Sequence, residues 1–102
     1  MVKDAFLEIS FPDHSSTAME IEGRDEVEDP IDDALKEAGI GKVTGGGGGW
    51  DRGFNIDVEI EDERNLAQAL QIIRQVLKDL KASPEATITH RDGNDTEYSI
   101  YE

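Results

Sequence analysis

Cysteine is absent from this chain of 102 residues, and proline, tryptophan and histidine are scarce, with three, one and two copies. The absence of cysteine excludes disulfides, iron–sulfur clusters and thiolate zinc sites, so the fold must depend on packing and backbone hydrogen bonds. No apolar run approaches the length that spans a bilayer, and Asp4 lies where a signal peptide would begin its apolar core. We therefore expect a cytoplasmic protein.

Basic residues are also few, because ten lysines and arginines stand against twenty-four acidic residues and give a net charge of -14. Phosphate backbones and anionic lipids would repel such a chain, so we expect neither nucleic acid nor a membrane as a partner. Basic proteins and cations remain open. Residues 13–37 are the most acidic segment, and its acids are Asp13, Glu20, Glu22, Asp25, Glu26, Glu28, Asp29, Asp32, Asp33 and Glu37.

The length and the 36% apolar content indicate one folded domain, because 102 residues can enclose one core but hardly two. We predict a single α+β domain over residues 1–102. Pro12 and the polar run after it interrupt the pattern, and residues 17–22 then resume a strand-like sequence. Residues 12–25 are therefore predicted to be either a mobile loop or a short N-terminal hairpin.

Two segments alternate apolar and polar residues with the period of a β-strand. Residues 3–11 place Leu7, Ile9 and Phe11 on one side, and residues 54–60 alternate without interruption. Each is predicted to be a strand with one face on the core and one in water. The tail, residues 86–101, has β-branched and aromatic residues on both sides of a turn signal and predicts a closing hairpin.

Val27 opens an amphipathic pattern that predicts a first helix, which ends at the left-handed stop Gly39. This helix begins either at an Asp29 N-cap followed by Pro30, or near Arg24 with Pro30 in its early turns. A longer second helix is predicted at about residues 63–81, with Asp62 as its cap. Its apolar stripe consists of Leu66, Ala69, Leu70, Ile73, Val76, Leu77 and Leu80.

A further strand is predicted between the first helix and residues 54–60, joined to the latter through the glycine run. The order of the elements then contains βαββαβ, which is the split βαβ arrangement of ferredoxin-like sandwiches. We therefore predict two helices on one face of an antiparallel sheet, with an additional hairpin at either end of the chain. Residues 38–60 resemble a group of small bacterial α+β proteins of unknown function. These proteins have a helix ending in glycine, a Val-Thr-Gly-Gly-Gly hairpin, an Asp-hydrophobic-Asp strand and a long helix. The resemblance implies a ferredoxin-like domain and no established activity.

Five consecutive glycines, residues 45–49, precede the only tryptophan. Exposed N–H groups of glycine can cradle an anion, but a P-loop would have Lys-Ser or Lys-Thr before a helix, whereas Trp50 and Asp51 precede a predicted strand. We interpret the run instead as a pliable hairpin that joins the two central strands, or as strand glycines that permit a bulge and the close approach of a helix.

Trp50, with Asp51 and Arg52, is a candidate partner contact because tryptophan is enriched among the residues that anchor interfaces. Packing of Trp50 against the sheet edge or a helix end is the alternative. Asp57, Glu59 and Glu61 share one strand face, yet they lack the interleaved ligand pattern of a calcium loop, and a solvated sheet face explains them.

His14 and His90 have no metal-binding spacing, and no serine lies in a nucleophile elbow. We predict no catalytic residues, no metal and no cofactor, and hence a non-enzymatic binding module. One form is an inhibitor of a basic protein, such as an immunity protein against a nuclease toxin. Asp25, Glu26, Glu28, Asp29, Asp32 and Asp33 are the predicted steering residues. The alternative is a ligand-binding or regulatory domain that acts as a homodimer.

Overall fold

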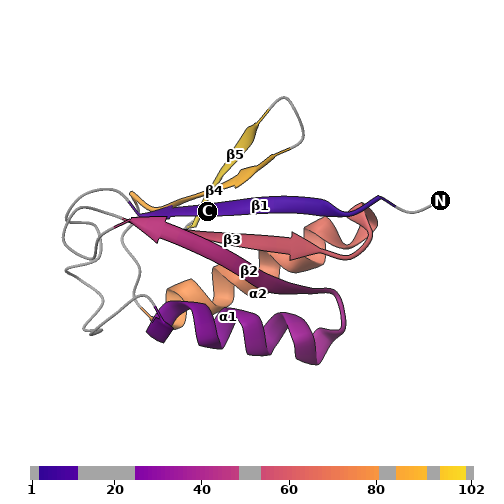
Figure 1. Cartoon of the computed structure of the whole chain (residues 1–102), viewed down its shortest axis with the longest axis horizontal. Coiled ribbons are helices and arrows are strands. Elements are labelled where there is room, and N and C mark those ends of the chain that lie inside the picture. Colours follow the sequence, from indigo (N-terminus) through magenta and orange to yellow (C-terminus); the bar gives the residue numbers. More distant parts are fainter. Residues whose placement is uncertain (1–2, 12–24, 49–53, 81–84, 92–94, 101–102) are drawn as a thin grey trace.

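The protein is an α+β domain with one antiparallel sheet and two long helices (Figure 1). The computed structural model describes residues 3–11, 25–48, 54–80, 85–91 and 95–100. Within these residues, no helix is both apolar enough and long enough to cross a membrane. The elements in chain order are β1 (Ala5–Phe11), α1 (Asp25–Ala38), β2 (Gly41–Gly48), β3 (Phe54–Ile60), a 3-10 turn η2 (Glu63–Asn65), α2 (Leu66–Asp79), β4 (Thr87–His90) and β5 (Thr96–Ser99).

The five strands lie in the order β2-β3-β1-β4-β5, and every neighbouring pair is antiparallel. Strand β3 therefore lies between β1 and β2, the two strands that α1 connects, and β1 lies between β3 and β4, which α2 connects. This arrangement is compatible with a ferredoxin-like fold, although the fifth strand goes beyond a simple split βαβ unit. The predicted C-terminal hairpin is confirmed as β4 and β5.

The core lies between the sheet and the helices, because both helices pack on the same sheet face (Figure 1). Register and burial agree, since each buried position of β1 lies opposite a buried apolar position of β3. The rings of Phe11 and Phe54 stack with centroids 4.5 Å apart. The predicted alternation of buried and wetter positions is confirmed in both strands. The largest fully buried side chains are Phe11, Leu7, Ile9, Ile31, Leu35, Ile56, Ile60, Ile73, Leu77, Ile88 and Ile100.

Helix α1 begins at Asp25 and contains Pro30 in its second turn. The prediction of an N-cap at Asp29 is therefore wrong, and the alternative start near Arg24 is confirmed. The physical reason is Val27, which is 0% exposed and lies on the same apolar face as the rest of the helix. Burial of one valine is worth about 1.5–3 kcal/mol, which offsets the single helical hydrogen bond lost at Pro30.

The end of α1 follows the glycine prediction. Gly39 has φ of +72°, and its N–H donates to the carbonyl of Lys36 at 3.0 Å. The Ile40 N–H donates to the carbonyl of Leu35 at 3.1 Å, and the Ile40 side chain is buried. These two bonds form a Schellman motif, which turns the chain sharply from α1 into β2.

Helix α2 is preceded by the tighter turn η2, so the α-helical part starts at Leu66 instead of residue 63. Asp62 is the predicted cap, and its carboxylate accepts from the Arg64 N–H at 3.0 Å. The cap holds η2, while the apolar stripe holds α2 against the sheet. Residues 12–24 lie outside the described residues, and with them the predicted N-terminal loop or hairpin.

Candidate functional site

Strand β2 forms one edge of the sheet, with β3 as its neighbour on the inner side. The prediction that the glycine run joins two central strands is therefore wrong for β2, which is an edge strand. Strand order depends on pairing between distant segments, which the local sequence pattern does not show. Residues 45–48 belong to the strand itself and pair with β3. The predicted bulge is confirmed: Val43 pairs with Val58 and Gly45 with Asp57, which leaves Thr44 as the extra residue.

The glycines permit β2 to lie close to the backbone of β3. The predicted close approach was to a helix, and the atoms nearest to Gly41 and Gly46 belong to β3 instead. A Cβ atom at Gly46 would collide with the carbonyl oxygen of Asn55. A Cβ at Gly41 would lie 2.6 Å from the carbonyl oxygen of Glu59. At Gly45, by contrast, a Cβ would meet only open space. Two positions of β2 thus require glycine for steric reasons, whereas Gly45 does not.

Asp32 connects α1 to the outer edge of β2. Its carboxylate accepts from the Val43 N–H at 2.9 Å and lies 2.7 Å from the Lys36 ammonium. The hydrogen bond from Lys36, followed by the bond from the Val43 backbone, lowers the pKa of Asp32 below its ordinary value of 3.8. The same pairing raises the pKa of Lys36. Asp32 therefore stays ionised and satisfies a backbone donor that the edge strand would otherwise present to water.

Three acids lie four residues apart on the outer side of α1, and we call Asp29, Asp33 and Glu37 the acidic stripe. All three side chains are exposed. Like charges four residues apart on a helix repel, and an acid in the last turn also opposes the helix dipole. Lys36, three residues after Asp33, partly offsets this repulsion, and the acidic stripe concentrates negative potential on one surface.

The predicted steering residues fall into different positions. Asp29 and Asp33 belong to the acidic stripe, whereas Asp32 turns toward β2 and Glu28 is half-buried. Asp25 and Glu26 lie in the first turn of α1, and their side chains are outside what the structure describes. The predicted partner contacts Trp50, Asp51 and Arg52 also lie outside the described residues. Glu37 also belongs to the acidic stripe but was not among the predicted steering residues, although its spacing from Asp33 was a usable signal.

The face of the sheet away from the helices is polar and carries the predicted carboxylates. Asn55 donates to Glu8 and to Asp57, both at 3.3 Å, and thereby bridges two acids on neighbouring strands. Arg91 lies 3.5 Å from Glu8. The alternation in β1 places Glu8 on this polar side, but only the register shows that it lies opposite Asp57.

Glu59 also lies on this face, 4.0 Å from the Lys42 ammonium, whereas Glu61 follows the end of β3 and is exposed. Within the described residues, no three metal-ligating side chains lie close enough to hold an ion. The structure thus gives Glu8, Asp57 and Glu59 cationic or amide neighbours. Phe6 is the one large apolar side chain exposed in the described part of the chain, at 49%.

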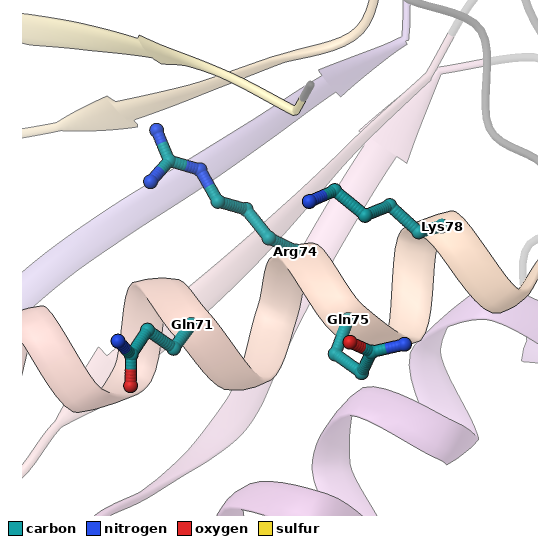
Figure 2. A pocket seen from close by; sticks show the side chains of 4 residues that line it. All are labelled: Gln71, Arg74, Gln75 and Lys78. Carbon is teal, nitrogen blue, oxygen red and sulfur yellow. The ribbon is translucent and has the colours of Figure 1, made fainter. Parts of the chain in front are cut away.

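A shallow depression of about 460 Å³ lies on α2 and is lined by Gln71, Arg74, Gln75 and Lys78. Figure 2 shows that Arg74 and Lys78 extend to one side of the helix, while the two glutamines point to the other. Arg74 donates through Nε to the Ser99 carbonyl at 2.9 Å and lies 6.0 Å from the Tyr98 ring centroid. The depression is therefore a surface without converging polar groups, and Arg74 ties α2 to β5.

No protein-family model matches the chain, and neither a curated protein nor a solved structure matches it significantly. The candidate site is therefore defined by geometry alone: the outer edge of β2, its connection to α1 through Asp32, and the acidic stripe beside it.

Proposed function

We propose that this protein is a non-enzymatic binding module of ferredoxin-like type whose partner is a basic protein, in the manner of an inhibitor or immunity protein. The acidic stripe of α1 is the observation that supports this proposal best. Its three exposed carboxylates repel one another at their four-residue spacing, and Lys36, three residues after Asp33, is the one lysine of the helix. A cationic partner would relieve that repulsion on binding.

The net charge of -14 extends the same argument to association kinetics. A strongly negative protein attracts a cationic partner over roughly a Debye length of 8–10 Å at physiological salt, and this attraction accelerates encounter. A local concentration of charge then selects which surface of the protein meets the partner. In this role the acidic stripe orients the partner toward α1 and the neighbouring edge of β2.

The experiment compares two triple variants with the same change in net charge. One neutralises the acidic stripe with Asp29→Asn, Asp33→Asn and Glu37→Gln. The control neutralises exposed acids elsewhere, with Glu61→Gln, Glu63→Gln and Glu97→Gln. Each is immobilised beside the wild type and offered to extract from the native source at low salt.

The proposal predicts a basic protein that the wild type and the control retain, that the stripe variant retains about tenfold less, and that elutes as salt rises. Equal retention by both variants would show that only net charge matters and would contradict the role of α1. Recovery of no basic protein by the wild type would contradict the proposed function itself.

A homodimeric ligand-binding domain is the second candidate, and exposed Phe6 in the middle strand β1 favours it. In that case the polar sheet face would be buried against a second copy. Light scattering of wild type and Phe6→Ser separates the two candidates. A dimer that Phe6→Ser converts to monomer supports the homodimer, whereas monomers in both samples favour the inhibitor.

A further inference from the structure

We propose that the outer edge of residues 45–48, the glycine half of β2, accepts an extended basic segment of the partner as an additional antiparallel or parallel strand. This proposal rests on the proposed function, and it specifies how the partner is bound. It depends on three features of the structure. They are the open backbone groups, which point away from β3; the missing cap, which is the absence of a side chain that covers this edge; and the charged neighbour, which is the acidic helix α1.

The open backbone groups follow from the register of β2. The Val43 N–H points outward, since it donates to Asp32 on α1. Backbone groups alternate between the two edges of an antiparallel strand, and the bulge at Thr44 restarts this alternation with the Gly45–Asp57 pair. On β3, the backbone N–H and C=O groups of Asp57 and Glu59 point toward β2, whereas those of Val58 between them point away from it. Gly45 lies opposite Asp57, so its own N–H and C=O groups point inward to β3. Gly46 and Gly48 then direct their N–H and C=O groups outward.

The missing cap distinguishes the glycine half from the first half of β2. Edge strands are usually protected by lysine, proline, a bulge or a covering side chain. The first half has Lys42, the bulge and the bond from Val43 to Asp32. Among the described residues, no side chain bonds the outward groups of Gly46, and Gly45 and Gly46 are both exposed. The edge is thus accessible to another backbone.

The opposite edge of the sheet is a less suitable acceptor. Strand β5 has four residues, including the acid Glu97, and Figure 1 shows its hairpin with β4 inclined away from the rest of the sheet. Every residue of β5 also carries a side chain. Strand β2 has eight residues, and its last four have none. Main-chain pairing by an added strand therefore meets least obstruction at the glycine half.

The charged neighbour is α1, which runs alongside β2 in the opposite direction (Figure 1). The contact of Asp32 with Val43 aligns the two elements. One helical turn before Asp32 stand half-buried Glu28 and exposed Asp29, at the same end of the domain as the glycine half, although β2 inclines away from α1 there (Figure 1). An added strand would thus lie on the same side of the molecule as the acidic end of α1. This favours a strand with basic side chains and disfavours a second copy of this chain, which has a net charge of -14.

The test uses the full chain and a synthetic peptide of alternating lysine and valine, which in extended form presents all lysines on one side. Two matched peptides carry N-methyl groups, one on every lysine and the other on every valine. Because backbone donors of a strand alternate between its edges, one methylated peptide loses the donors that would face Gly46, while the charge stays constant. Calorimetry measures the three affinities, and amide NMR follows Gly46 and Gly48.

The proposal predicts binding of the unmodified peptide, about tenfold weaker binding of one methylated peptide, and shifts at the Gly46 and Gly48 amides. Equal affinities for all three peptides would overturn strand addition and leave a purely electrostatic partner. Protection of the Gly46 amide in the dilute free protein would also overturn it, because the edge would then be occupied already. Failure of every peptide to bind would count against both strand addition and the proposed function.

Discussion

The two halves of β2 belong to one strand, pair with the same neighbour and lie beside the same helix, yet their outer edges differ. In the first half, the Val43 N–H is bound by Asp32 of α1. In the glycine half, residues 45–48, the described side chains leave the outward groups of Gly46 uncovered. The comparison teaches that a single helical carboxylate can close an edge locally, and that removal of side chains keeps the rest of the edge available.

The steric requirement for glycine gives the largest expected effect. Gly46→Ala should lower the free energy of unfolding by about 1–3 kcal/mol, because its Cβ meets the backbone oxygen of Asn55 and the strand must move. Gly45→Ala is the matched control, since its Cβ enters open space, and it should change stability by at most about 0.5 kcal/mol. Urea denaturation measures both. Equal effects would mean that β2 is not held against β3 as described.

Removal of the connection between α1 and β2 should have the next largest effect. Asp32→Ala leaves the half-buried Val43 N–H without its acceptor and should cost about 1–2 kcal/mol of unfolding free energy. Asp32→Asn keeps an oxygen acceptor and should cost less. Asp33→Ala, at the exposed neighbouring position, should stay within about 0.5 kcal/mol. If Asp32→Ala proves as mild as Asp33→Ala, the first half of β2 is not closed by α1.

Acid should weaken the same connection, because the pKa of Asp32 is lower in the folded protein than its ordinary value of 3.8. A depressed carboxyl pKa contributes stability that is fully present above about pH 5 and is lost as pH falls through the folded-state pKa. The stability difference between wild type and Asp32→Asn should thus be constant near neutral pH and shrink below about pH 4. Denaturation at a series of pH values checks this, and a difference that grows on acidification would contradict it.

The smallest effect is expected at the bulge itself. The Thr44 hydroxyl donates to the Asp57 carbonyl at 3.3 Å from an exposed position. Thr44→Ala should therefore change the free energy of unfolding by less than about 0.5 kcal/mol, since the backbone pairing and Asp32 already define the bulge. Thermal denaturation is sufficient to test this. A loss of stability comparable to that of Gly46→Ala would mean that the Thr44 hydroxyl, and not the backbone pairing, stabilises the bulge.

Much of the fold follows from local sequence rules. The strict alternation of residues 54–60 and the apolar stripe of α2 predict their elements because burial of one face determines both patterns. The Asp29 N-cap prediction failed at the same level of reasoning. Capping and proline rules favour a start at Pro30, but the burial of Val27 extends the helix by more than one turn.

The candidate site was less predictable, because it depends on contacts between distant residues. Asp32 on a helix surface has the sequence pattern of a solvated acid, and only its contact with Val43 across eleven residues shows a structural role. The edge position of β2 likewise follows from the pairing of β1 with β3 and β4. The glycine run indicated a bulge and close approach, but no local rule distinguishes an edge strand from a central one.

Hydrogen exchange of individual glycine amides in the free protein tests the central claim most directly. At a dilution where the chain is monomeric, the account predicts slow exchange for Gly45 and Gly47, which pair with β3, and fast exchange for Gly46 between them. The Val43 amide should exchange slowly in wild type and faster in Asp32→Ala. Equal protection at Gly45, Gly46 and Gly47 would contradict an open outer edge in the glycine half of β2.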